Sequence, residues 1–118
     1  MHFTFGEVQT FVSDLGRAIV FYRDILGLNL KQESDSWAIF DISGVEFVLL
    51  AGAQSFNKGH YGEKCGTVLC LKSDSIEAAI CFLKEKNVAI VQETKQVPQG
   101  KYAVISDPDG NFIEIIQH

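Results

Sequence analysis

Cysteine is scarce in this chain: its 118 residues include only three, Cys65, Cys70 and Cys81. Their number is odd and no C-x-x-C motif occurs, which argues against both a disulfide framework and a zinc clip. We expect Cys70 and Cys81 to be small reduced core residues, because the first lies in a strand pattern and the second in a helical pattern.

Long apolar runs and basic clusters are also missing. The longest apolar run, residues 47–53, is far below the roughly 20 residues that a membrane-spanning helix needs, so no membrane partner is expected. The net charge is −5 without any lysine or arginine cluster, which argues against nucleic acid as a partner. The first residues lack the basic and apolar segments of a secretory signal, so the expected location is cytoplasmic.

The chain has the composition of an ordinary globular domain. Apolar residues make up 47% and charged residues 21%, which excludes intrinsic disorder. The length suits one domain. We expect this single domain, residues 1–118, to contain two modules, at about 3–52 and about 65–118, joined by a Gly-rich linker at about 53–64.

Hydrophobic patterns repeat along the chain with a period of about 60–65 residues. The first half predicts a helix at 15–26, capped by Asp14, and strands at 5–12, 28–33, 37–42 and 45–51. The second half predicts a helix at 75–86, capped by Asp74 with Glu77 completing a capping box, and strands at 66–71, 88–93, 101–105 and 111–116. Each half is βαβββ, so we predict an α+β fold whose two modules form a curved eight-stranded sheet around a cleft.

Three motifs accompany this repeat. They are VSDL at 12–15 running into AIVFY at 18–22, LGL at 26–28, and DPDGNFIEI at 107–115. With the repeat, they resemble the vicinal oxygen chelate (VOC) superfamily, which includes glyoxalase I, fosfomycin- and bleomycin-resistance proteins and extradiol dioxygenases. The last motif is similar to the family's D-P-D-G-x-x-x-E-L ending. The resemblance implies the βαβββ fold and a small-molecule ligand, but a fold does not specify a reaction.

The resemblance also implies one divalent metal ion (Ni, Zn, Mn or Fe) held by side chains from both halves. Carried over residue by residue, the family's metal positions fall on Glu7, Val48, Thr67 and Glu114. Two of these are carboxylates, Thr67 offers a weak neutral oxygen, and Val48 offers no donor. We therefore expect either a metal held by Glu7 and Glu114 with water completing its coordination, or no metal.

Glu114 is the candidate catalytic residue, because it lies in an otherwise apolar strand where a charge is costly unless paired, protonated or metal-bound. It would shuttle a proton next to a carbonyl. Strand alternation places Gln9 and Phe11 on the face of Glu7, and Glu46 on the face of Val48. Ligand sites combine apolar walls with a few polar groups. The candidate ligand-contacting residues are Gln9, Phe11, Trp37, Glu46, Val48, His60, Thr67, Tyr102 and Phe112.

Two functions stay open at this point. One is a metal-dependent, glyoxalase-like lyase or dioxygenase. The other is metal-free binding of a drug or metabolite, as in the bleomycin-resistance proteins. Family members of this length usually look like homodimers, and we expect one here. Each predicted helix carries apolar residues off its main stripe, Val20 and Phe21 in the first and Cys81 and Phe82 in the second, which favours burial against a second copy.

Overall fold

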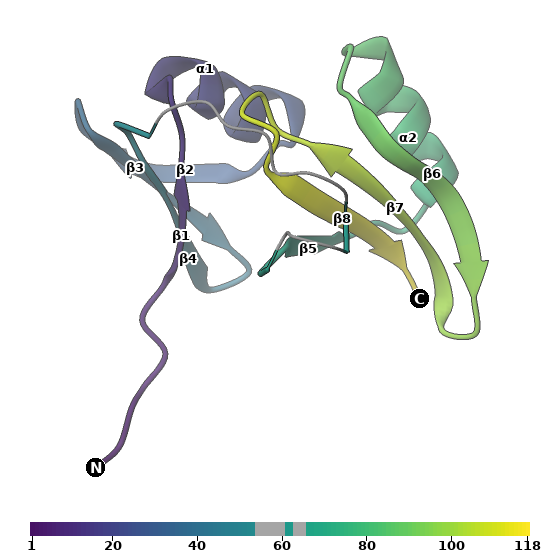
Figure 1. Cartoon of the computed structure of the whole chain (residues 1–118), viewed down its shortest axis with the longest axis horizontal. Coiled ribbons are helices and arrows are strands. Elements are labelled where there is room, and N and C mark those ends of the chain that lie inside the picture. Colours follow the sequence, from purple (N-terminus) through teal and green to yellow (C-terminus); the bar gives the residue numbers. More distant parts are fainter. Residues whose placement is uncertain (54–60, 63–65) are drawn as a thin grey trace. The chain divides into compact units, whose positions relative to one another are not determined.

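The computed structural model describes residues 1–53, 61–62 and 66–118. The chain divides into two compact units, Met1–Ser55 (unit 1) and Phe56–His118 (unit 2). Each unit contains a helical segment and a four-stranded sheet in the order βαβββ (Figure 1). The predicted α+β class with two βαβββ modules is therefore confirmed. Within the described residues, the strands of each unit pair in one four-stranded sheet.

Unit 1 contains β1 (Val8–Phe11), β2 (Asn29–Glu33), β3 (Trp37–Ile42) and β4 (Val45–Leu50), in the sheet order β1-β4-β3-β2. Strand β1 is parallel to β4, and the other pairs are antiparallel. The first strand is shorter than predicted. Because Val8 pairs with Phe47, the first residue of β4 lies level with Gly6, so the segment before Gly6 has no strand of this sheet beside it.

The helical segment of unit 1 begins as α1 (Leu15–Ile19) and continues as the π-helical turn η1 (Val20–Ile25). Asp14 caps it as predicted, accepting the backbone N–H of Arg17 at 3.0 Å. A π turn is wider than an α turn, and here the consecutive Phe21 and Tyr22 are both buried. Phe21 is thus part of the core of its own unit, and its predicted role in a dimer contact is wrong.

The core of unit 1 is an aromatic cluster between η1 and the sheet. The ring of Tyr22 lies 5.1 Å from that of Phe47 and 6.2 Å from that of Phe40, and Phe40 lies 6.3 Å from Phe47. Phe40 and Phe47 therefore face the helix. Side chains alternate along a strand, so Val48 and its cross-strand neighbours Gln9 and Ile39 lie on the opposite side. We call the side of each sheet away from its helix the far face.

Unit 2 contains β5 (Leu69–Lys72), α2 (Ile76–Glu85), β6 (Ile90–Val97), β7 (Gly100–Ser106) and β8 (Phe112–Gln117), with the sheet order β5-β8-β7-β6. Helix α2 buries Ile76, Ile80 and Leu83. Its N-cap is Ser75, whose side chain accepts the Ala78 N–H at 3.3 Å. The predicted capping box of Asp74 and Glu77 is therefore wrong, and Glu77 instead pairs with Lys101.

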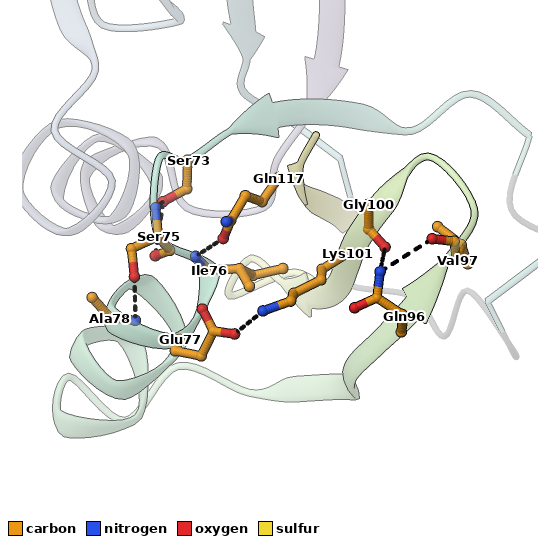
Figure 2. Close-up of polar contacts among 10 residues, drawn as sticks. All are labelled: Ser73, Ser75, Ile76, Glu77, Ala78, Gln96, Val97, Gly100, Lys101 and Gln117. Carbon is orange, nitrogen blue, oxygen red and sulfur yellow. Dashed lines mark hydrogen bonds and ion pairs between the residues drawn. The ribbon is translucent and has the colours of Figure 1, made fainter.

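Polar contacts fix the start of α2 on its sheet (Figure 2). The Ile76 N–H donates to Gln117 Oε1 at 2.7 Å, and Lys101 Nζ donates to Glu77 Oε1. The bonded Lys101 ammonium lowers the pKa of the Glu77 carboxyl. Because α2 is attached at one side of the sheet, the far face of unit 2 consists of strand residues that the helix does not cover.

The two cysteines within the described residues, Cys70 and Cys81, are both exposed. The prediction that they are core residues is wrong for both. Cys70 alternates with the half-buried Leu69 and Leu71 on β5, an edge strand, and Cys81 is not among the buried residues of α2. In the part of the chain that the structure describes, no helix is long and apolar enough to cross a membrane.

Asp107 organises the turn between β7 and β8. Its buried carboxylate accepts the backbone N–H groups of Asp109 at 2.9 Å and Asn111 at 2.8 Å, and the Asn111 side-chain amide at 2.9 Å. We expect Asp107→Ala to lower the free energy of unfolding by about 1–3 kcal/mol, because buried N–H groups lose their acceptor. Urea denaturation measures this loss. The exposed Asp35 provides a control variant, Asp35→Ala, and equal losses in both variants would contradict the assigned role.

Candidate functional site

Glu114 is the centre of the candidate site. On the far face of unit 2, the strand register aligns Gln92 of β6, Val104 of β7, Glu114 of β8 and Cys70 of β5 in one row. The Tyr61 hydroxyl donates a hydrogen bond to Glu114 Oε2. The Glu114 carboxylate is therefore bound by a neighbouring side chain, as expected for a charge in an apolar strand.

Aromatic packing holds the Tyr61 hydroxyl in place. The Tyr61 ring packs edge-to-face on Phe112, with 5.7 Å between ring centroids. Phe112 lies two residues before Glu114 on β8, so both side chains project from the same face. The far face thus combines a carboxylate, a phenol and an aromatic wall within a few residues of one strand, an arrangement suited to a ligand with an apolar body and a hydrogen-bond donor.

Cys70 lies beside Glu114 but is not activated. Although Cys70 is exposed as a residue, the partial burial of its thiol raises the thiol pKa, and the neighbouring Glu114 carboxylate raises this pKa further. The thiolate, and not the thiol, acts as nucleophile and metal ligand. The Cys70 side chain therefore stays protonated at neutral pH and contributes shape to this face rather than reactivity.

On unit 1, Glu7 lies immediately before β1 and accepts a hydrogen bond from Gln9 Nε2 at 2.9 Å, and both residues are exposed. Glu7, Gln9 and the half-exposed Phe11 alternate along the segment and share the far face. Val48 is buried at 5% exposure. The structure thus brings the predicted Glu7, Gln9 and Val48 to one face, where Glu7 is the carboxylate nearest the start of β1.

Glu46, the second residue of β4, forms an ion pair. Its carboxylate accepts from Lys31 Nζ at 3.0 Å, and this bond raises the pKa of the Lys31 ammonium. Both side chains are well exposed, so the pair contributes little stability. Of the two predicted aromatic wall residues, Trp37 is half-buried opposite Leu50, and Tyr102 is half-buried opposite Ile116. His60 lies outside the described residues.

The strand registers change one repeat assignment. Gln9 pairs with Val48, and Cys70 pairs with Glu114, so Cys70 is the repeat equivalent of Gln9, given that Val48 corresponds to Glu114. The equivalent of Glu7 is then Val68 and not Thr67. Thr67 is exposed and lies in a bend before β5. One residue of offset exchanges the two faces of a strand, so Thr67 does not occupy the position that the repeat assigned to it.

Neither unit by itself supplies enough side-chain donors at these positions to form a metal centre. Glu7 and Glu114 are carboxylates, but each unit supplies a valine at the matching position, Val68 in one and Val48 in the other. Among the described residues, no three His, Cys, Asp or Glu side chains are grouped so that they could hold a metal ion. Both carboxylates also accept hydrogen bonds from neighbouring side chains.

The sequence patterns did not identify three residues of this face: Tyr61, Cys70 and Gln92. Tyr61 follows His60 in the Gly-rich linker, and no periodicity connects it with β8. Cys70 was assigned to the core. The position of Gln92 depends on irregularities in the pairing of β6 with β7, which leave no mark in the sequence.

Comparison with known proteins gives consistent results. The family model of the glyoxalase/bleomycin resistance protein/dioxygenase superfamily matches residues 4–115. The metallothiol transferase FosB of Staphylococcus saprophyticus is 28% identical over 111 residues, which span 93% of this chain and 74% of that protein. FosB of Staphylococcus haemolyticus is 27% identical over 106 residues, 88% of this chain and 76% of that protein.

Two solved structures illustrate the range of similar folds. The fosfomycin resistance protein FosX from Listeria monocytogenes has a TM-score of 0.80 at 15% identity, covering 100% of this chain and 95% of that one. TnmS3, an antibiotic binding protein from Streptomyces sp. CB03234, has a TM-score of 0.67 at 27% identity, covering 98% of both chains. The similarity to FosX supports the fold alone.

Proposed function

Since this chain belongs to the glyoxalase/bleomycin resistance protein/dioxygenase superfamily, we propose that it binds a small organic molecule on the far face of unit 2, with Glu114 as the polar anchor. The observation that carries this proposal is the Glu114 carboxylate, hydrogen-bonded by Tyr61 and flanked by the aromatic Phe112. A ligand with a hydroxyl or ammonium donor would pair with this carboxylate while its apolar body packs against the aromatic wall.

Two observations favour binding without a metal. Only two of the family's metal positions hold carboxylates, Glu7 and Glu114. The other two hold valines, Val48 and Val68, which have no donor atom for a metal. One similar protein of known structure, TnmS3, is an antibiotic binding protein. In this reading Glu114 recognises the ligand directly, and Tyr61 is a positioning residue that orients the carboxylate.

A second candidate function is metal-dependent group transfer. It is favoured by the similarity to the metallothiol transferase FosB and by the carboxylates at two metal positions, Glu7 and Glu114. In such a reaction a divalent ion would act as a Lewis acid toward substrate oxygens. The homodimer predicted from the sequence also stays a prediction. Of the four residues named for its contact, Val20, Cys81 and Phe82 are exposed.

A thermal-shift experiment separates the two functions. The protein is melted with a library of antibiotics and metabolites in the presence of EDTA, and separately with nickel, zinc, manganese or iron(II) alone. We expect an organic compound to raise the melting temperature in EDTA, because a ligand that binds only the folded state stabilises it. Stabilisation by a metal alone, with none by any organic compound in EDTA, would support the transferase and contradict metal-free binding.

A charge-removing variant then tests Glu114 itself. We expect Glu114→Gln to raise the dissociation constant of the selected compound by roughly 10- to 100-fold in isothermal titration calorimetry, because one charge-assisted hydrogen bond is lost. The control is Glu93→Gln, which removes an exposed carboxylate of the same unit that pairs with Lys84 at 3.0 Å. Unchanged affinity in Glu114→Gln would remove Glu114 from the site.

A further inference from the structure

Residues 1–6 form an extended arm whose apolar side chains are exposed. Met1 is 103% exposed, Phe3 90% and Phe5 71%. The arm continues the direction of β1 beyond the sheet of unit 1 (Figure 1). Single exposed apolar residues are common on protein surfaces, but a contiguous group of large ones marks an interaction site. The arm is therefore a candidate contact with another molecule.

The arm has the sequence pattern of a strand but no strand of its own unit beside it. Apolar side chains alternate with polar or small ones through residues 1–6, which is the period of a half-buried strand. Strand β4 begins level with Gly6, so the backbone N–H and C=O groups of residues 1–5 lie beyond the sheet. An unpaired strand of this kind is a template for pairing with another chain.

Two edge strands carry features that oppose such pairing, and the arm does not. Strands β2 and β6 each contain a register shift and expose charged side chains, for example Lys31 of β2 and Glu93 of β6. Shifts and charges protect sheet edges from other molecules. Residues 1–6 contain no Asp, Glu, Lys or Arg, and a Cβ atom added at Gly6 would meet no atom within 4 Å. The space beside the arm is thus open to a partner segment.

The apolar surface of the arm is large enough to hold two copies together. Aromatic side chains bury about 150–250 Å² each, so Met1, Phe3 and Phe5 of one arm offer about 400–600 Å². Two exchanged arms, together with the partner surface that they cover, would bury about 1,600–2,400 Å², which reaches the roughly 1,200–2,000 Å² of a stable interface. Docking of one arm on its own chain would bury only half of this area, so the area favours reciprocal exchange.

We propose that residues 1–6 are an exchanged arm, which lies as a β-strand against a second copy of this chain in a twofold dimer. Phe3 and Phe5 anchor the arm on the partner, and its backbone completes its hydrogen bonds there. Strand addition combines main-chain hydrogen bonds for affinity with alternate side chains for specificity. This contact does not rest on the proposed ligand site, and it differs from the helix contacts that the sequence predicted.

Sedimentation equilibrium at micromolar concentration tests the arm. We expect the unchanged chain to sediment at twice its 13.1 kDa mass. Combining Phe3→Ser with Phe5→Ser should raise the dimer dissociation constant by at least about 100-fold, because each copy loses two buried phenyl rings. Circular dichroism should be unchanged, since neither ring belongs to the core of its own unit. The matched control is Thr4→Ser, which alters the same arm and keeps both rings, and it should stay dimeric.

NMR on a mixed sample identifies the contact directly. Copies labelled with ¹³C are mixed with unlabelled copies, and filtered spectra record only nuclear Overhauser effects between the two. We expect such effects from the ring protons of Phe3 and Phe5, together with protection of their backbone amides from hydrogen exchange. Both signals should be absent in a sample diluted below the dimer dissociation constant.

Four results would overturn the arm exchange. The first is a dimer that the combined Phe3 and Phe5 substitutions leave intact. The second is a wild-type dimer without contacts between Phe3 or Phe5 and the other copy. The third is a monomer at micromolar concentration with protected arm amides, which would show that the arm docks on its own chain. The fourth is a monomer with unprotected arm amides.

A variant in α2 separates the arm from the helix contact. Phe82 is 41% exposed on this helix, and Phe82→Ser removes one apolar ring from the surface of unit 2. If the arm forms the interface, Phe82→Ser stays dimeric. Dissociation of Phe82→Ser, with no change in the combined Phe3 and Phe5 variant, would assign the interface to α2 and refute the arm.

Discussion

Replacing Phe47 by alanine is expected to lower the free energy of unfolding by about 3–5 kcal/mol, the usual cost of deleting a buried phenyl ring. Phe47 is 1% exposed and contacts both Tyr22 of η1 and Phe40 of β3, with ring centroids 5.1 and 6.3 Å away. These contacts attach the helix to the sheet of unit 1. Their loss leaves a cavity at the point where three elements meet.

The matched control for Phe47 is Phe11, the same residue type on the far face of the same sheet. Phe11 is 54% exposed, so Phe11→Ala should change stability by less than about 1 kcal/mol. Urea denaturation followed by tryptophan fluorescence reports on unit 1, because Trp37 of β3 is the only tryptophan of the chain. Similar midpoint shifts in the two variants would contradict the assignment of the aromatic cluster as the core.

Much of the fold could be predicted because the signals were local. Strand β3 is found at the predicted residues 37–42, and α2 (Ile76–Glu85) and the α1–η1 segment lie within the predicted helices. Apolar periodicity determines such elements directly. The errors arose at strand ends, where pairing with a neighbouring strand determines how far a strand extends. The predicted strand start at residue 5 was too early, because β4, the strand beside β1, begins only level with Gly6. Strand β6 extends to Val97 because β7 pairs with it beyond the predicted end.

The candidate site was less predictable, for a physical reason. Glu114 could be identified because a lone charge in an apolar strand is costly. Its partners could not, because Tyr61 reaches it from 53 positions earlier in the chain and Gln92 reaches the far face only through a bulge. The repeat pointed to Thr67, whereas the strand register gives Val68. This offset of one residue exchanges the face on which the side chain lies.

The distribution of donors across the two repeats indicates how the units differ chemically. At equivalent far-face positions, unit 1 has Gln9 and Val48 where unit 2 has Cys70 and Glu114. Gln92 and Gln32 are also equivalent, but Gln32 is exposed and lies beside Ile39, with no carboxylate two strands away at Val48. Only unit 2 therefore has a carboxylate in this row of the far face, which is why the proposed function concerns that unit.

Gly100→Ala is expected to lower the free energy of unfolding by about 3–5 kcal/mol, from positive-φ strain and from steric overlap together. Gly100 begins β7 with a φ of +146°, which side-chain-bearing residues rarely adopt. A Cβ atom there would lie 2.1 Å from the backbone oxygen of Gln117 and 2.9 Å from the Cα of His118. Both contacts are with backbone, so β8 itself would have to move.

The displacement should also reach α2, because the Gln117 side chain accepts the Ile76 N–H at the start of that helix (Figure 2). We therefore expect the Ile76 amide signal to shift in ¹H–¹⁵N NMR spectra of Gly100→Ala, alongside the lower urea midpoint. The control is Gly27→Ala: Gly27 has a φ of +71° but no atom within 4 Å of an added Cβ. It should lose only about 1–2 kcal/mol, the cost of a left-handed backbone alone. If the two variants lose the same stability, the close approach of β7 to β8 at Gly100 does not constrain the fold.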